Sequence, residues 1–220
     1  MLHYLQNLFQ ALDFSSLADA ALRAAAVFLC LTVHETCHGL AALALGDPTA
    51  KSMHRLSLNP LRHIDWLGLA LMFAAGFGWA KPVPVNPNYF RKPKQGMAIT
   101  ALAGPVSNFL LAILFLGIGK AIYLYAPYSD GMNVLFSWCL YTVAPMSVGM
   151  GLFNLIPFPP LDGSKVLAVF LPDGAYGKLM RYERCGILIL LALSWLGLGG
   201  NALGNAIYSV YAALFHIFFA

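Results

Sequence analysis

The chain has 220 residues, of which 60% are hydrophobic and 10% are charged, and its formal net charge is +4. Soluble domains contain about 45–50% apolar and about 25% charged residues, so this chain has too few charges for the surface of a water-soluble globular protein. The high apolar content also excludes intrinsic disorder. The composition therefore predicts that a lipid bilayer surrounds most of the chain.

Long uncharged stretches predict the membrane-spanning helices. Because an α-helix rises about 1.5 Å per residue, about 20 apolar residues cross the hydrocarbon core of a bilayer. In chain order, the expected spans cover about residues 16–45, 97–125 and 132–156, and a short helix is expected over 163–171. The uncharged stretch 185–220 is too long for one span, and its glycines predict a hairpin of two shorter helices.

These helices predict an all-α, multi-pass membrane protein with about five helices in a single domain, residues 1–220, whose core covers about 16–171. Residues 66–80 are uncharged but too short to cross a bilayer as a helix. The prolines between Lys81 and Pro87 favour extended backbone. We therefore expect a re-entrant or short β element near residues 66–90.

Basic residues indicate how the chain is oriented. Most of the thirteen lysines and arginines lie in two segments, 46–96 and 159–184. Two predicted spans separate these segments, so both face one side, which the positive-inside rule identifies as the cytoplasm. Nucleic-acid binding would require a basic stripe interleaved with aromatic residues on a soluble surface, so no nucleic-acid partner is expected. No sequence pattern indicates an oligomeric state.

The run His34-Glu35-Thr36-Cys37-His38 matches the pattern H-E-x-x-H and lies in the first predicted helix. Residues four apart share one helix face, so the two imidazoles can bind one metal ion with Glu35 beside the open coordination position. A carboxylate at membrane depth is costly and should have a functional partner. The structural alternative is a polar helix–helix contact between Glu35 and a histidine.

A catalytic zinc site needs a third protein ligand. Asp162 ends the uncharged stretch 131–161, and the proline break before it can turn its carboxylate inward. As an alternative, Asp162 forms a turn or caps the helix that follows. We predict one zinc ion per chain. Its expected ligands are His34, His38 and Asp162, with Glu35 as the general base.

Together these motifs resemble those of the site-2 proteases, which are intramembrane zinc metalloproteases. The resemblance covers about residues 28–170 and includes H-E-x-x-H on the first long helix. The run from Asn154 to Gly163, N-L-I-P-F-P-P-L-D-G, is similar to the family segment N-x-x-P-x-x-P-L-D-G, which contains the ligand Asp. The run A-G-P-V-S-N, which ends at Asn108, resembles the family stretch G-P-x-x-N. Ser164 departs from the pattern, because many members have a second glycine there.

The resemblance implies hydrolysis of peptide bonds within or near transmembrane helices of other membrane proteins, as in regulated intramembrane proteolysis, in a prokaryotic plasma membrane. It also implies that Asn154 orients the substrate or assists at the oxyanion. As an alternative, Asn154 bonds carbonyls freed by the proline break. Asn108 and Gly104 are expected along the substrate path, with helix packing as their alternative role.

Two alternative functions would use some of the same residues. A metal or ion transporter could employ the His, Glu and Asp cluster as a transit site, although the chain lacks the inverted repeats of many carriers. Another kind of H-E-x-x-H membrane protease would take its third ligand from a later glutamate. The one later glutamate, Glu183, lies in a basic segment typical of a solvated loop.

Overall fold

The computed structural model describes residues 14–68, 81–172 and 200–220, together with isolated positions between 174 and 196. In this part of the chain, four helices are long and apolar enough to cross a membrane. They are Leu17–Ala44, Pro93–Tyr125, Asp130–Asn154 and Gly200–Phe219. The described residues contain no β-strand. The prediction of an all-α, multi-pass membrane protein is confirmed.

In the described part of the chain, α-helices alternate with loops and short irregular helices. The α-helices are α2 (Phe14–Ala44), α3 (Thr49–Ser52), α5 (Pro93–Tyr125), α6 (Asp130–Trp138), α7 (Ala144–Asn154), α8 (Asp162–Leu167) and α11 (Gly200–Phe219). Three short 3-10 helices are η1 (Pro60–Arg62), η2 (Pro87–Tyr89) and η4 (Ala168–Phe170), and η3 (Cys139–Val143) is a π-helix.

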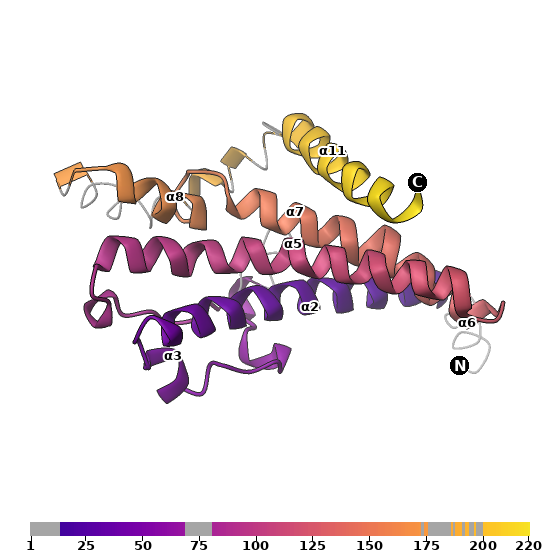
Figure 1. The fold of residues 1–220 in the computed structure, drawn as a ribbon, viewed down its shortest axis with the longest axis horizontal. Helices are drawn as coiled ribbons and strands as arrows, with labels where there is room; N and C mark the ends of the chain where they lie inside the picture. The colour runs from indigo at the N-terminus through magenta and orange to yellow at the C-terminus, as the bar shows by residue number, and fades with distance from the viewer. Residues whose placement is uncertain are drawn as a thin grey trace, which may run out of the picture.

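Helix α5 is the central element of the bundle. Figure 1 shows α5 between α2 and α7, with α11 on the far side of α7. Helix α8 returns along α5, and the Lys94 ammonium donates to the Leu171 carbonyl at 2.9 Å. One buried apolar cluster joins α5 to the third span, and aromatic side chains of α11 pack against it. Its buried members are Ala112, Leu116, Cys139, Leu140, Ala144 and Val148.

Helix α2 ends at Ala44, one residue before the predicted boundary. Gly46 has a φ of +103°, which glycine adopts without a side-chain clash. The Gly46 N–H donates to the Leu43 carbonyl at 3.0 Å, and the Asp47 N–H donates to the Ala42 carbonyl at 2.9 Å. These are the two hydrogen bonds of a Schellman motif. The motif turns the chain out of the bundle and into the basic segment.

The third span is continuous but widens before Pro145. Proline lacks an N–H, and its ring clashes with the carbonyl four residues earlier in a regular α-helix. The π-helix η3 lies directly before this position and provides a wider turn. The Tyr211 hydroxyl of α11 donates to the Leu140 carbonyl inside η3 at 2.8 Å, so α11 is tied to the irregular turn.

Some boundaries differ from the predicted ones. Helix α5 begins at Pro93 rather than at 97, because proline is well suited to the first turn of a helix. The third span ends at Asn154, two residues earlier than predicted. Residues 81–86 form no helix or strand, the backbone of Asn86 is extended, and Pro82 and Pro84 favour the same geometry for the residues before them, so we call residues 81–86 the extended segment. Pro87 opens η2.

Two predicted elements fall partly outside the described residues. The re-entrant or β element expected near 66–90 includes residues 69–80, which the structure does not describe. Of the hairpin predicted over 185–220, the second arm corresponds to α11. Most of its first arm lies outside the described residues.

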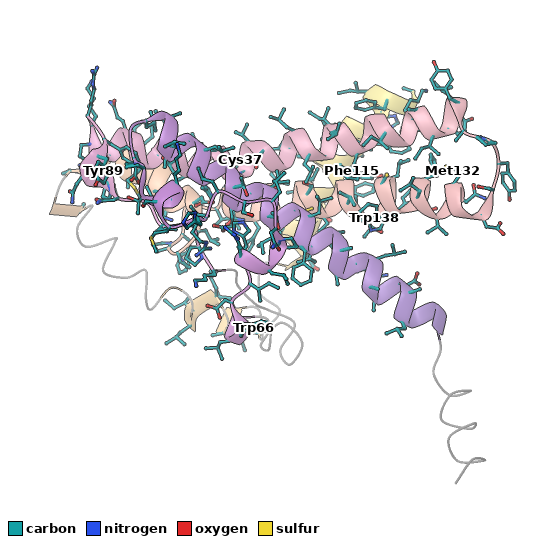
Figure 2. The ribbon with its side chains drawn as sticks, turned by 90° about the horizontal axis from the view of Figure 1, so that it is seen from below. Cys37, Trp66, Tyr89, Phe115, Met132 and Trp138 are labelled. Atoms are coloured by element: carbon teal, nitrogen blue, oxygen red, sulfur yellow. The ribbon has the colours of Figure 1, made fainter. Side chains whose placement is uncertain are left out.

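The basic segment 46–96 and the loop that precedes α6 lie at opposite ends of the bundle. Figure 2 shows Tyr89 of the basic segment at one end and Met132 of α6 at the other. The Ser129 side chain accepts the N–H of Met132 at 3.2 Å and so caps α6. The spans therefore separate the two loops along the long axis.

The close approach of α5 to η3 generates a prediction. A Cβ at Gly119 would lie 3.2 Å from Leu140 Cγ and closer to its Cδ1, whereas a Cβ at Gly117 would meet Phe218 Cε1 at 3.5 Å. Overpacking a filled core costs about 1–3 kcal/mol. Thermal unfolding in detergent should therefore show Gly119→Ala destabilised by that amount, with Gly117→Ala no less stable than the wild type. Equal melting temperatures for the two variants would contradict this packing.

Candidate metal centre

Three side chains that are far apart in the sequence meet between α2 and the start of α8. His34 Nε2 and His38 Nε2 each lie 3.1 Å from Asp162 Oδ2, and the two Nε2 atoms lie 3.0 Å from each other. All three residues are buried, and their candidate ligand atoms lie within 4.8 Å of one another. We call His34, His38 and Asp162 the ligand group. The structure brings together the three residues that the sequence analysis selected as ligands.

The ligand group fits a zinc ion by its donor chemistry and its spacing. Zinc is commonly bound by histidine nitrogen and carboxylate oxygen, with three protein ligands in a catalytic site. Ligands about 2.1 Å from a tetrahedral zinc ion lie about 3.4 Å from one another. The observed separations of 3.0–3.1 Å are close to that value. Cys37, partly buried on α2 and between the two histidines in the sequence, is not part of the group.

Asn108 of α5 lies against the far side of the His34 ring. It is completely buried, its Nδ2 lies 3.2 Å from His34 Nδ1, and its Oδ1 has no hydrogen-bond partner in the structure. A half-turn of the amide exchanges these two atoms and lets Oδ1 accept the Nδ1–H of His34. In that arrangement the Nε2 lone pair of His34 faces the ligand group, as metal binding requires.

The second imidazole is oriented by the backbone of α5. His38 Nδ1 donates to the carbonyl of Thr100 at 2.7 Å. This hydrogen bond places the proton on Nδ1 and leaves Nε2 free to bind a metal. Sequence analysis missed Thr100, because a backbone carbonyl has no residue-specific signal.

Gly104 of α5 provides the space that the two rings occupy. A Cβ at this position would lie 2.6 Å from His34 Cε1 and closer still to two atoms of the His38 ring. Because real Cβ atoms do not approach other atoms so closely, any side chain here would displace both imidazoles. Helix α5 therefore contacts the ligand group directly at Gly104.

The proline segment between α7 and α8 turns Asp162 back toward α2. A Cβ at Gly163 would fall onto the backbone carbonyls of Leu155 and Ile156, so only glycine permits this packing. Ser164, at the position where the sequence departs from the family pattern, is buried, and its hydroxyl donates to the Leu161 carbonyl at 2.7 Å.

Electrostatics keep the Asp162 carboxylate ionised. Burial acts to raise its pKa, but the contacts with the His34 and His38 imidazoles and the charge of Lys165 outweigh burial and hold the pKa well below its usual range. The Lys165 ammonium lies 3.7 Å from Asp162 Oδ1. An ionised carboxylate beside two imidazoles is a suitable site for a divalent cation.

Two further residues selected from the sequence lie near the ligand group or at the end of α7. Glu35 is half-buried on α2, and its Oε2 accepts the N–H of Val83 at 2.8 Å. The Asn154 amide donates to the Met150 carbonyl, one turn earlier in α7, at 3.0 Å. This bond joins Asn154 to a carbonyl within its own helix.

Known relatives identify the class of protein to which this candidate metal centre belongs. The chain is 36% identical over 196 residues to YwhC of Bacillus subtilis, across 84% of this chain and 88% of the relative. It is 29% identical to Rip2 of Mycolicibacterium smegmatis, across 74% and 62%, and 32% identical to a protein of Methanocaldococcus jannaschii, across 40% and 23%. All three are named as zinc metalloproteases.

The chain therefore belongs to the site-2 protease family of zinc metalloproteases. No family model and no solved structure matches it. The relatives imply Zn²⁺, which agrees with the donor set of the ligand group.

Gly104 gives the sharpest test of how the rings are packed. Gly104→Ala must displace both imidazoles, and disturbing the orientation of zinc ligands typically lowers affinity by about 10–100-fold. Competition between the protein and a chelator should measure this loss. Gly117→Ala, on the same helix but in ordinary contact only, is the matched control. Unchanged zinc affinity in a folded Gly104→Ala protein would contradict the packing described.

Proposed function

We propose that this zinc metalloprotease hydrolyses peptide bonds within or near the transmembrane helices of other membrane proteins. The observation that carries the proposal is the position of the ligand group. His34 and His38 lie on a helix long and apolar enough to cross a membrane, Leu17–Ala44, and Asp162 is only 8% exposed. A protease that acted on soluble chains would have little use for ligands in such apolar surroundings.

The proposed chemistry divides the work among four side chains. His34, His38 and Asp162 would hold the zinc ion, which supplies Lewis-acid polarisation of the scissile carbonyl and activation of water. Glu35 would take the proton from the attacking water and deliver it to the leaving amine. Because Val83 N–H occupies Oε2 of Glu35, we assign the proton transfer to Oε1.

The substrate must present an accessible carbonyl. Carbonyls in a helix are hydrogen-bonded and shielded, so the cleaved stretch has to unwind. The extended residues 81–86, together with the element predicted over 66–80, would offer an edge to which the unwound stretch adds as a strand. Asn154, at the end of α7, would orient the substrate or assist at the oxyanion by leaving its bond to Met150.

Asn108 and Gly104 were expected along the substrate path, and their contacts favour a different role. Asn108 is fully buried against His34, and Gly104 lies behind both imidazoles. We propose that these two residues hold the imidazoles in place rather than contact the substrate.

The setting we propose is a prokaryotic plasma membrane, with segments 46–96 and 159–184 on the cytoplasmic side and regulated intramembrane proteolysis as the process. The basic residues of the two segments support this orientation, and the relatives come from bacteria and an archaeon. The transporter alternative is not supported, because the relatives are named as proteases.

The deciding experiment separates catalysis from metal binding. In Glu35→Gln the ligand group is intact, so we expect zinc to remain near one ion per chain while cleavage of a transmembrane reporter falls by about 10²–10⁴-fold, the range for a general base. Asp162→Ala should lose both zinc and cleavage. Zinc content and gel-based cleavage in nanodiscs are the measurements.

The control is Glu183→Gln, which removes the one later glutamate and should leave zinc content and cleavage unchanged. Full cleavage by Glu35→Gln would overturn the proposed function. So would loss of zinc in Glu183→Gln together with its retention in Asp162→Ala.

A further inference from the structure

The extended segment, residues 81–86, lies along α2 and is tied to it near the ligand group. At its start, the Arg55 guanidinium donates to the Lys81 carbonyl at 2.8 Å. In its middle, the Val83 N–H donates to Glu35 Oε2 at 2.8 Å. Because Pro82 and Pro84 have no N–H and favour extended neighbours, Val83 supplies the one N–H in this proline-flanked stretch.

The end of the extended segment is fixed by a buried carboxylate. Asp47 is 0% exposed, and its Oδ2 accepts the N–H of Asn86, 39 residues away in the chain, at 2.7 Å. Its Oδ1 accepts the N–H of Thr49 at 2.9 Å and the Thr49 hydroxyl. Asp47 therefore joins the turn after α2 to the end of the extended segment.

Asp47 remains charged although it is buried. Burial acts to raise its pKa, but the hydrogen bonds from Thr49 and Asn86 outweigh that effect and lower it. A buried carboxylate is tolerated only where hydrogen bonds replace its hydration. Without this carboxylate, the N–H of Asn86 would lose its partner and the segment its fixed end.

Gly39 of α2, the residue after His38, packs closely against Val83 of the extended segment. A Cβ at Gly39 would lie 3.1 Å from Val83 Cγ1 and closer still to Leu56 Cδ2. Because Gly39 has no side chain, both Leu56 and the extended segment pack closely against the helix here. Val83 is 8% exposed, so the position of its N–H depends on where the whole segment is seated.

We propose that Asp47 is a positioning residue for proteolysis, which fixes the extended segment so that the Val83 N–H orients the Glu35 carboxylate toward the ligand group. Arg55 fixes the other end of the segment in the same way. This inference rests on the proposed function of Glu35. An error of about 1 Å in the placement of a reacting group can reduce a rate by about 10²-fold, so a secured carboxylate is a catalytic advantage.

The test compares Asp47→Ala with Thr49→Val in the full-length protein in nanodiscs. Asp47→Ala removes the acceptor of the Asn86 N–H, whereas Thr49→Val removes a hydroxyl donor to the same carboxylate and leaves the Asn86 bond in place. We expect Asp47→Ala to lower kcat by about tenfold or more, since misplacement of a catalytic group acts on turnover. Its KM for a transmembrane reporter should rise as well, because residues 81–86 are also the proposed substrate edge, so kcat at saturating substrate is the measurement that tests positioning. Thr49→Val should lower kcat by less than Asp47→Ala does.

Two readouts distinguish positioning from general damage to the fold. Zinc content of Asp47→Ala should equal that of the wild type, while hydrogen exchange at the Val83 and Asn86 amides should become faster. Asp47→Asn keeps one acceptor oxygen and should restore part of kcat, and it serves as the test variant if Asp47→Ala does not fold. In a Glu35→Gln background, Asp47→Ala should reduce the residual rate no further, because both changes act through one carboxylate.

The outcomes separate this inference from the proposed function. If Glu35→Gln is inactive while Asp47→Ala keeps the wild-type kcat, the positioning role of Asp47 is overturned and the proposed function stands. Loss of zinc in Asp47→Ala, or a kcat loss equal in Thr49→Val, would also overturn the positioning role. Full activity of Glu35→Gln would overturn the proposed function itself.

Discussion

The burial of two imidazoles and a carboxylate in an apolar bundle is the constraint on which the rest of this structure depends. An unpaired polar group in such surroundings costs roughly 1–3 kcal/mol or more, so each must find a partner. The outward nitrogen of His38 finds the Thr100 carbonyl, and that of His34 finds Asn108. The inward atoms are left facing one another, which is an unfavourable arrangement unless a cation lies among them.

The bundle meets this constraint by removing side chains where helices approach. Gly104 lets α5 reach the two imidazoles, and Gly163 lets the start of α8 lie on the backbone of Leu155. These close approaches place α5 against the two imidazoles and hold Asp162 at the start of α8. The proline segment before Asp162 is thus an irregular part of the fold that positions one of the ligands.

Two carboxylates outside the ligand group meet the same constraint, because hydrogen bonds replace the water that burial removes. Glu35 lies within α2 and Asp47 follows its end, and each carboxylate accepts a backbone N–H from the extended segment. Prolines restrict that segment to extended geometry and leave few donors, so its hydrogen bonds fall at defined positions. The group that we assign to proton transfer is thus attached to an element outside the helical bundle.

Charge-free stretches and the H-E-x-x-H spacing were sufficient to predict the spans and the ligand group, because the burial cost of charge and the periodicity of a helix act on local sequence. Asp162 was predicted because it alone broke a long uncharged stretch at a proline turn. The roles of Thr100 and Val83 were decided by tertiary structure, since their contributions are backbone groups that every residue possesses. Asp47 resembled an ordinary turn residue until folding brought its carboxylate to Asn86, 39 positions along the chain. Contacts of this kind depend on where the chain passes in space, which no local pattern specifies.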